Sequence, residues 1–143
     1  FSHVTVSVRD LQRAAVFYDA ILAPLGLRRR PITPDGRRLL GGPGHDLQRY
    51  YVHNPFDGMP VSVGNGSMVA FQPSLEAVAA AFNAGLAFGG ADEGAPGHRP
   101  RHGDGCGAYL CDPGGNKVHV VHRRNSTDEA KTNSAFKFAS RRE

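Results

Sequence analysis

Two histidines on expected strands are the side chains best suited to bind a metal or to move a proton. His119 follows a turn at residues 112–116, whose Pro and two Gly favour tight bends, and it stands among three valines typical of a strand. His3 opens the segment 3–8, in which polar residues alternate with valines. An imidazole between buried valines either lines a cavity or is a core histidine. Residue type alone favours the core interpretation of His119, because most buried polar groups are simply paired.

The two cysteines point to a reducing environment. Cys106 and Cys111 lie five residues apart in the strand-like segment that precedes the turn. An odd spacing turns their side chains to opposite faces of a strand, so they cannot readily form a disulfide. Without a CxxC pair or a disulfide framework, and with no signal-peptide pattern in the first residues, we expect a cytoplasmic protein.

Charge and hydropathy argue against nucleic acid and membrane partners. The net charge is +4, and arginines cluster at residues 28–30, 37–38, 123–124 and 141–142. These clusters are short and have no aromatic residues among them, so a solvated surface is the favoured interpretation over a nucleic-acid site. No apolar run approaches the roughly 18 residues that cross a bilayer.

The elements that must position these side chains form a single globular domain. With 143 residues, of which 40% are hydrophobic, the chain can bury a core. After the strand at residues 3–8, Asp10 is a good N-cap for a helix that ends at Pro24 and Gly26. Three short strands are then expected at 27–30, 37–40 and 48–53. The apolar stripe of the helix comprises Leu11, Ala14, Ala15, Tyr18, Leu22 and Leu25.

The same order of elements starts again near residue 67. A strand at residues 67–71 is followed by a helix capped by Ser74, and a loop through residues 94–100 leads into a hairpin over residues 107–121. We therefore predict an α+β fold of two βαβββ modules, about 1–66 and 67–124, in a domain of residues 1–124 with a C-terminal tail at 125–143. The stripe of the second helix comprises Leu75, Val78, Ala79, Phe82 and Leu86.

Several blocks of this sequence resemble the glyoxalase/bleomycin resistance/dioxygenase superfamily, also called vicinal-oxygen-chelate proteins. The resemblance implies that the paired modules curl into a half-open barrel around a small-molecule site, and that the chain forms a homodimer that covers exposed sheet edges. The blocks are residues 3–18 with 22–27, then Asn-Pro-Phe-Asp-Gly at 54–58, Gly-Asn-Gly-Ser-Met-Val-Ala-Phe at 64–71, Asp-Glu-Gly-Ala-Pro-Gly at 92–97 and Asp-Pro-x-Gly-Asn-Lys at 112–117.

The resemblance also implies a ligand set, which this sequence changes. Metal-binding relatives use a His on the first strand, a Glu late in the first module, a His opening the second module and a Glu after the Asp-Pro-x-Gly-Asn-Lys block. These positions fall on His3, near Tyr50, on Met68 and on His119. Two imidazoles suit Zn²⁺ or Ni²⁺ better than Mg²⁺ or Mn²⁺, with a third donor such as His53 or His102. Nothing in the sequence requires a metal, so the cofactor remains unknown.

Two functions remain open. The first is a lyase, isomerase or dioxygenase-like enzyme in which a metal polarises two vicinal oxygens of a small substrate. The second is a metal-free protein that binds or sequesters a small molecule, with Tyr50, Met68, His102 and Tyr109 around the ligand. His102 precedes the last hairpin, where relatives often carry a His, although an exposed loop histidine is the simpler interpretation. By resemblance, we expect His3 and His119 to meet on the concave face.

Overall fold

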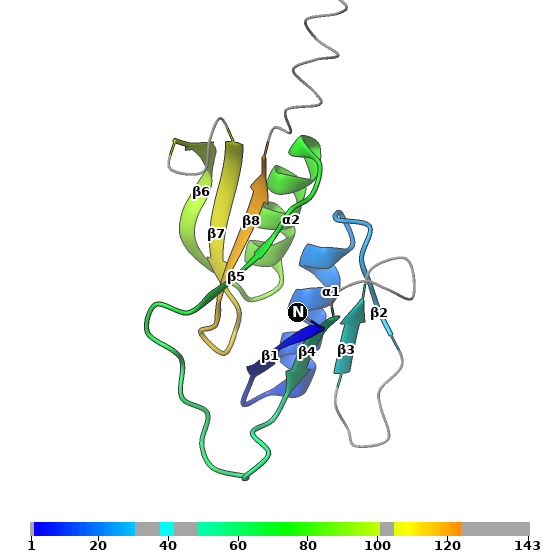
Figure 1. Cartoon of the computed structure of the whole chain (residues 1–143), viewed down its shortest axis with the longest axis vertical. Helices are drawn as coiled ribbons and strands as arrows, with labels where there is room; N and C mark the ends of the chain where they lie inside the picture. Colours follow the sequence, from blue (N-terminus) through cyan, green and yellow to red (C-terminus); the bar gives the residue numbers. More distant parts are fainter. Residues whose placement is uncertain (1, 31–37, 42–48, 101–104, 124–143) are drawn as a thin grey trace, which may run out of the picture.

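The computed structural model describes residues 2–30, 38–41, 49–100 and 105–123, so His102 and the tail at 125–143 lie outside the described residues. Two βαβββ units follow one another along the chain (Figure 1). The first unit comprises β1 (His3–Ser7), α1 (Leu11–Leu22), β2 (Arg28–Arg29), β3 (Arg38–Gly41) and β4 (Arg49–His53). The second comprises β5 (Met68–Phe71), α2 (Leu75–Ala87), β6 (Ala91–Arg99), β7 (Gly105–Cys111) and β8 (Lys117–His122).

Each unit forms its own four-stranded sheet, and the two sheets have the same topology. The strand orders are β1-β4-β3-β2 and β5-β8-β7-β6. In each sheet the first and last strands of the unit pair in parallel, and the other pairs are antiparallel. The α+β class and the repeat of two βαβββ modules are therefore confirmed, and the two sheets are not closed into a barrel.

Helix α1 begins where the sequence predicts. The carboxylate of Asp10 accepts hydrogen bonds of 3.0 Å from the backbone N–H groups of both Gln12 and Arg13, which satisfies two of the orphan donors of the first turn. The buried face is wider than the predicted stripe, because it also includes Phe17 and Ile21. A helix packed against a sheet on one side and a second helix on the other must bury more than one stripe.

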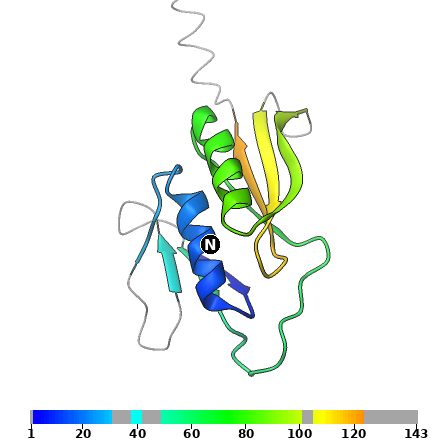
Figure 2. The same ribbon diagram turned by 180° about the vertical axis from the view of Figure 1, so that it is seen from behind.

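The two helices pack against each other between the sheets, as Figure 2 shows from behind. Most of their buried residues belong to one core cluster that draws on both modules. Gly85 of α2 permits this approach, because a Cβ there would stand 2.6 Å from Leu110 Cδ1 and 3.0 Å from Ile21 Cγ2. None of the described helices is long and apolar enough to cross a membrane.

One expected loop is instead a strand. Residues 94–100 were predicted as a loop from their Gly and Pro content, but β6 runs through Ala91–Arg99 as the edge strand of the second sheet. An edge strand tolerates Pro96, since one side of its backbone has no ladder partner to satisfy. The register with β7 shifts on both sides of Gly94, which indicates an irregular, bulged strand.

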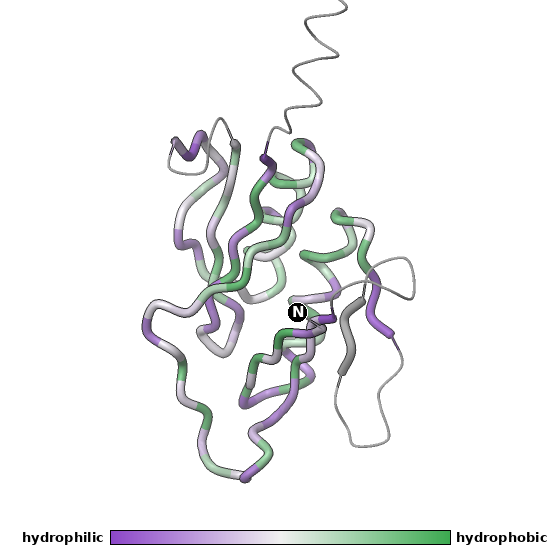
Figure 3. The backbone as a smooth tube through the Cα atoms, in the orientation of Figure 1, coloured by the Kyte–Doolittle hydropathy of each residue, from purple (hydrophilic) through white to green (hydrophobic). Residues whose placement is uncertain are grey.

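A long exposed linker at residues 54–67 joins the modules and carries apolar side chains at its surface. Phe56 is 91% exposed and Met59 63%, and several short stretches of this segment are coloured as hydrophobic in Figure 3. The linker is nevertheless attached at both ends of its course. Asn54 Nδ2 donates to the carbonyls of Val8 and Arg9, and Val63 packs on the turn between β7 and β8.

Candidate functional site

The face of the second sheet that points away from α2 gathers most of the side chains able to bind a ligand. Residues alternate between the two faces of a strand, so the paired residues of β5, β7 and β8 assign each side chain to a face. Val118 and Val120 face the core with α2, and the intervening residues face the other way. We call this set the second-sheet face, and it comprises Met68, Ala70, Tyr109, Cys111, Lys117 and His119, with Gly94 and Arg99 from β6.

At the centre of the second-sheet face, His119 is stacked on Tyr109. The two residues are direct cross-strand partners, their ring centroids are 4.2 Å apart, and the rings are inclined by only 14°. His119 is 1% exposed, whereas Tyr109 remains half-buried. Gly107 makes room for the imidazole, because a Cβ at that position would stand 2.7 Å from His119 Nε2. The sheet therefore holds His119 in one place against the more accessible tyrosine.

Two cations flank the Tyr109 ring. The Arg99 guanidinium carbon lies 5.2 Å from the ring centroid and Lys117 Nζ lies 5.3 Å from it, both within cation–π range. Arg99 Nη2 donates to the carbonyl of Ala95 at 2.7 Å, and Lys117 Nζ forms an ion pair with Glu93 at 3.3 Å. Two positive charges and one negative charge leave this end of the face with a positive balance, which suits an acidic ligand.

Cys111 lies beside Lys117 but is a poor nucleophile. Partial burial raises the pKa of its thiol above the ordinary value, and the negative charge of Glu93 raises it further. The thiolate is the reactive form of cysteine, so this environment disfavours a catalytic role. Cys106 and Cys111 are both free, and they point to opposite faces of β7, as their spacing predicts.

The structure places His3 in the first sheet, where it is exposed. Its Nδ1 is 2.7 Å from Ser2 Oγ, and its ring lies edge-on to Tyr51 with the centroids 5.1 Å apart. Among the described contacts, His3 thus neighbours Tyr51 of its own module, whereas His119 neighbours Tyr109 of the other. The convergence of the two histidines on one concave face stays a prediction.

Tyr50 is in the core and not on the face that carries His3. It is 5% exposed, and its hydroxyl lies 3.0 Å from Tyr18 Oη beneath α1. Strand alternation explains the difference, since Val4 pairs with Tyr50 whereas Thr5 pairs with Tyr51. Tyr51 therefore shares the face of His3. The sequence comparison placed the first-module ligand position near Tyr50, one residue before Tyr51.

The Tyr18–Tyr50 pair ends on a buried carboxylate. Tyr18 Oη donates to Asp112 Oδ2 at 2.9 Å, and Asp112 is 3% exposed. Burial raises the pKa of both tyrosine hydroxyls, and the Asp112 charge adds to this shift. Asn116 Nδ2 donates to the Ser7 carbonyl at 3.0 Å, so the turn before β8 binds the end of β1. The network joins the modules, and its burial marks it as structural.

The described residues do not match the donor set that metal-binding relatives use. They contain no group of three or more His, Cys, Asp or Glu side chains that could hold a metal ion. Met68 is 42% exposed at the sheet edge, where it pairs with Lys117, and an ammonium group beside a metal would oppose its charge. His53 lies on the same face of the first sheet as His3, opposite its register partner Ser7, and its Nδ1 contacts the carbonyl of Asn54.

Sequence reasoning missed Arg99, Glu93 and Lys117 as site residues. Lys117 is the last residue of the Asp-Pro-x-Gly-Asn-Lys block and lies two residues before His119. Because side chains alternate along a strand, this spacing alone would have predicted that Lys117 and His119 share a face. Arg99 and Glu93 belong to β6; Arg99 lies in the segment 94–100 that the sequence predicts as a loop, and Glu93 lies directly before it. Their position beside Tyr109 and Lys117 depends on the irregular β6–β7 register, which no local pattern reveals.

Comparison with known proteins identifies the family. No protein-family model matches the sequence, and a search of curated proteins likewise found no match. A solved glyoxalase/bleomycin resistance protein from Albidiferax ferrireducens T118 is 37% identical, with a TM-score of 0.77, covering 87% of this chain and 98% of that chain. A glyoxalase/bleomycin resistance protein/dioxygenase family enzyme from Burkholderia phytofirmans PsJN (20% identity, TM-score 0.62, 85% and 96% coverage) and a lactoylglutathione lyase from Agrobacterium tumefaciens (18%, 0.58, 85% and 92%) share the fold. The repeated βαβββ modules and the identity to the Albidiferax protein show that this chain belongs to the glyoxalase/bleomycin resistance/dioxygenase superfamily.

Proposed function

We propose that this protein binds a small acidic molecule with a flat conjugated part on the second-sheet face, by contacts from its own side chains. The observation that carries the proposal is the Tyr109–His119 stack with the Arg99 and Lys117 cations over the Tyr109 ring. A half-buried aromatic ring beside two cations offers both a stacking surface and charge-assisted hydrogen bonds.

Each part of the face has a defined contribution in this proposal. His119 stacks against one face of the Tyr109 ring, so the ring is held before the ligand arrives. Lys117 and Arg99 receive the acidic group, and the exposed thioether of Met68 adds an adaptable apolar contact next to Lys117. His102, which lies outside the described residues, remains part of the proposed ligand site because it follows β6 in the sequence.

The enzymatic alternative, a lyase or dioxygenase-like reaction, has less support among the described residues. The family chemistry inferred from the sequence depends on carboxylates that serve as ligand and base, and here those positions carry Tyr50 and His119. Tyr50 is bonded in the core and His119 is covered by Tyr109. Neither side chain therefore replaces a carboxylate as an accessible base, and binding is the function that the face supports better.

We also propose a cytoplasmic homodimer. The strands β1 and β2 are the edges of the first sheet, and β5 and β6 are the edges of the second. Exposed edges favour association because their backbone groups lack partners on one side. Light scattering at micromolar concentrations should give about twice the monomer mass of 15.3 kDa, and the monomer mass would contradict the dimer.

The binding proposal can be tested with a set of planar aromatic carboxylates and calorimetry. Lys117→Met and Arg99→Met each remove a charge but keep an unbranched side chain. Each change should weaken binding of the best ligand by about tenfold, the loss expected for a hydrogen bond to a charged group. Arg28→Met is the matched control, since Arg28 is an exposed arginine of β2 in the other module, and it should bind as the parent does.

Two results would contradict this proposal. One is an unchanged affinity in both Lys117→Met and Arg99→Met, because the acidic group would then bind elsewhere. The other is binding that disappears on treatment with a chelator and returns only with a divalent ion, which would restore the metal-dependent interpretation.

A further inference from the structure

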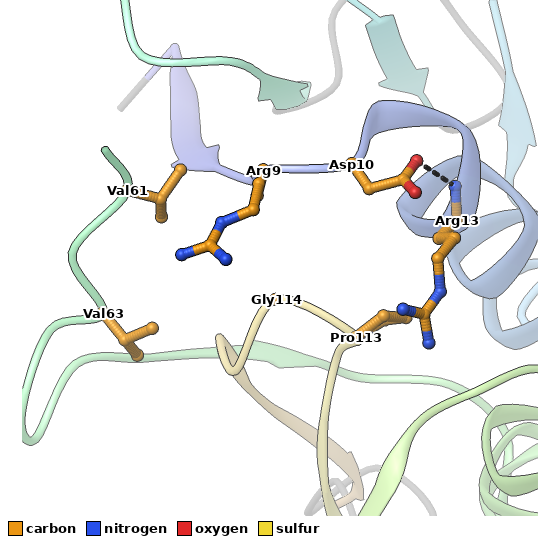
Figure 4. Close-up of a pocket in the computed structure, with 7 residues that line it drawn as sticks. All are labelled: Arg9, Asp10, Arg13, Val61, Val63, Pro113 and Gly114. Atoms are coloured by element: carbon orange, nitrogen blue, oxygen red, sulfur yellow. Dashed lines mark hydrogen bonds between the residues drawn. The ribbon is translucent and has the colours of Figure 1, made fainter. Parts of the chain in front are cut away.

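A cavity of about 350 Å³ lies where three separate parts of the chain meet, as Figure 4 shows. Arg9 and the N-cap Asp10 directly precede α1, Arg13 lies in its first turn, and the rest of the wall comes from the linker and from the turn between β7 and β8. The cavity shares no lining residue with the second-sheet face. The linker contributes Val61 and Val63, and the turn contributes Pro113 and Gly114.

The walls of this cavity are fixed by contacts that do not involve a ligand. Asn54 Nδ2 donates to the carbonyls of Val8 at 2.8 Å and Arg9 at 3.0 Å, which ties the start of the linker to the end of β1. Farther along, Val63 lies against Gly115, since a Cβ there would stand 3.1 Å from Val63 Cγ2. Asp112 Oδ1 accepts from the backbone N–H of Gly114 at 2.8 Å and holds the turn. The cavity is therefore formed before any ligand binds.

The charges around the cavity favour an anion. Figure 4 shows the Arg9 side chain extending between the linker and the turn, and the Arg13 side chain reaching the opposite side beside Pro113. Within the described part of the chain, the ion pairs are Arg29–Asp19 and Lys117–Glu93, so neither Arg9 nor Arg13 is engaged in one. Asp10 offsets one of the two positive charges. Its Oδ1 already accepts from the backbone N–H groups of Gln12 and Arg13, so an incoming anion would be bound by guanidinium groups.

The remaining wall is apolar, so a ligand that fills the cavity also needs an apolar part. Val61, Val63 and Pro113 offer hydrocarbon surface beside the arginines. A second cavity of about 390 Å³ adjoins along the linker and shares Arg9 and Val61 with the first, so space continues past the guanidinium group of Arg9. A guanidinium fork matches a planar carboxylate with two parallel hydrogen bonds. Both volumes lie near the lower end of the roughly 300–1,000 Å³ usual for small-ligand sites.

We propose that this cavity is a second binding site, which takes a small organic carboxylate with a compact apolar body. Arg9 and Arg13 bind the carboxylate, and Val61, Val63 and Pro113 enclose the body. The site does not depend on the proposed ligand of the second-sheet face. It would give the chain two separate positions for acidic molecules, one against an aromatic ring and one against aliphatic side chains.

The test uses cyclohexanecarboxylate as the probe, with cyclohexanecarboxamide as a neutral analogue of the same shape and acetate as an anion without the apolar body. Calorimetric titration of the full chain should show the carboxylate binding at least about tenfold more tightly than either analogue. Arg9→Gln and Arg13→Gln should each weaken it by about tenfold, while Arg28→Gln, an exposed arginine on β2, should not change it. Both arginines are exposed, so we expect unchanged thermal unfolding in the variants.

The position of the probe is measured independently from amide chemical shifts. Shifts at Val61, Val63 and Gly114 are expected, and shifts confined to Tyr109 and Lys117 would place the probe on the second-sheet face and overturn the proposal. It is equally overturned if the probe does not bind at millimolar concentration, if the carboxamide binds as well as the carboxylate, or if both glutamine variants bind like the parent.

Discussion

Replacing Tyr18 with Phe should destabilise the protein more than replacing its hydrogen-bonded partner Tyr50 with Phe. The difference follows from the direction of the hydrogen bonds. Asp112 is acceptor-only when ionised, so Tyr18 donates its proton to Asp112 Oδ2 at 2.9 Å, and it then accepts from Tyr50 Oη at 3.0 Å. All three side chains are at most 5% exposed, and water cannot easily replace a lost partner.

The magnitude can be worked from the two bonds that Tyr18 makes. A hydrogen bond to a charged group contributes about 1.5–3 kcal/mol, and an orphaned buried hydroxyl costs about 1–3 kcal/mol. Tyr18→Phe loses the bond to Asp112 and leaves the Tyr50 hydroxyl without its partner, so we expect a loss of about 3 kcal/mol in the free energy of unfolding. Asp112 keeps the donors Gly114 N, Asn116 N and Asn116 Nδ2, which limits the loss.

Tyr50→Phe removes the outer donor and leaves the Tyr18–Asp112 bond in place, so it should cost about 1 kcal/mol. The double variant should be no less stable than Tyr18→Phe alone, because it also removes the orphaned hydroxyl. Urea unfolding of the four proteins, with similar m-values as the check on two-state behaviour, measures this cycle. Equal costs for the two single changes, or strict additivity in the double variant, would refute the proposed direction of the bonds.

Three further predictions concern pH, capping and the histidines. Burial raises the pKa of both tyrosines above about 10, so the folded state keeps protons that the unfolded chain loses. The free energy of unfolding should therefore fall as pH rises above about 10. The variant with both tyrosines replaced by Phe should show a smaller fall when unfolding is measured across this pH range. Asp10→Ala should cost about 1 kcal/mol by urea unfolding, and Ser74→Ala should cost less because Ser74 makes no side-chain cap bond; equal costs would count against the cap. His119→Ala should lower stability by about 2–3 kcal/mol through the cavity it leaves, whereas the exposed His3→Ala should change it by less than about 0.5 kcal/mol; the reverse order in thermal unfolding would contradict their burial.

Local patterns were sufficient to predict most of the elements. The alternation at residues 3–8 corresponds to β1, Asp10 caps α1 as predicted, and the repeat near residue 67 gives a second sheet of the same topology. Local sequence patterns did not predict the structure of segments whose conformation depends on tertiary contacts. The Gly and Pro residues of β6 are typical of a loop, and they are accommodated because the strand is at an edge.

The candidate site was harder to predict because it depends on which face of a strand a residue occupies. Tyr50 and Tyr51 are adjacent in the sequence, yet one is bonded in the core and the other shares the face of His3. A shift of one residue inverts such an assignment. Asp112 was predicted only as a turn residue, and its role as the acceptor for Tyr18 joins positions 94 residues apart in the chain. Such a contact cannot be read from local spacing.

The central claim is that a ligand binds on the second-sheet face, and amide and side-chain chemical shifts measured during titration with the best aromatic carboxylate test it most directly. We expect the largest shifts at Tyr109, Lys117 and Arg99, with a change at the His119 ring that supports Tyr109. Shifts that instead gather on His3 and Tyr51 of the first sheet, with none at Tyr109, would contradict the account.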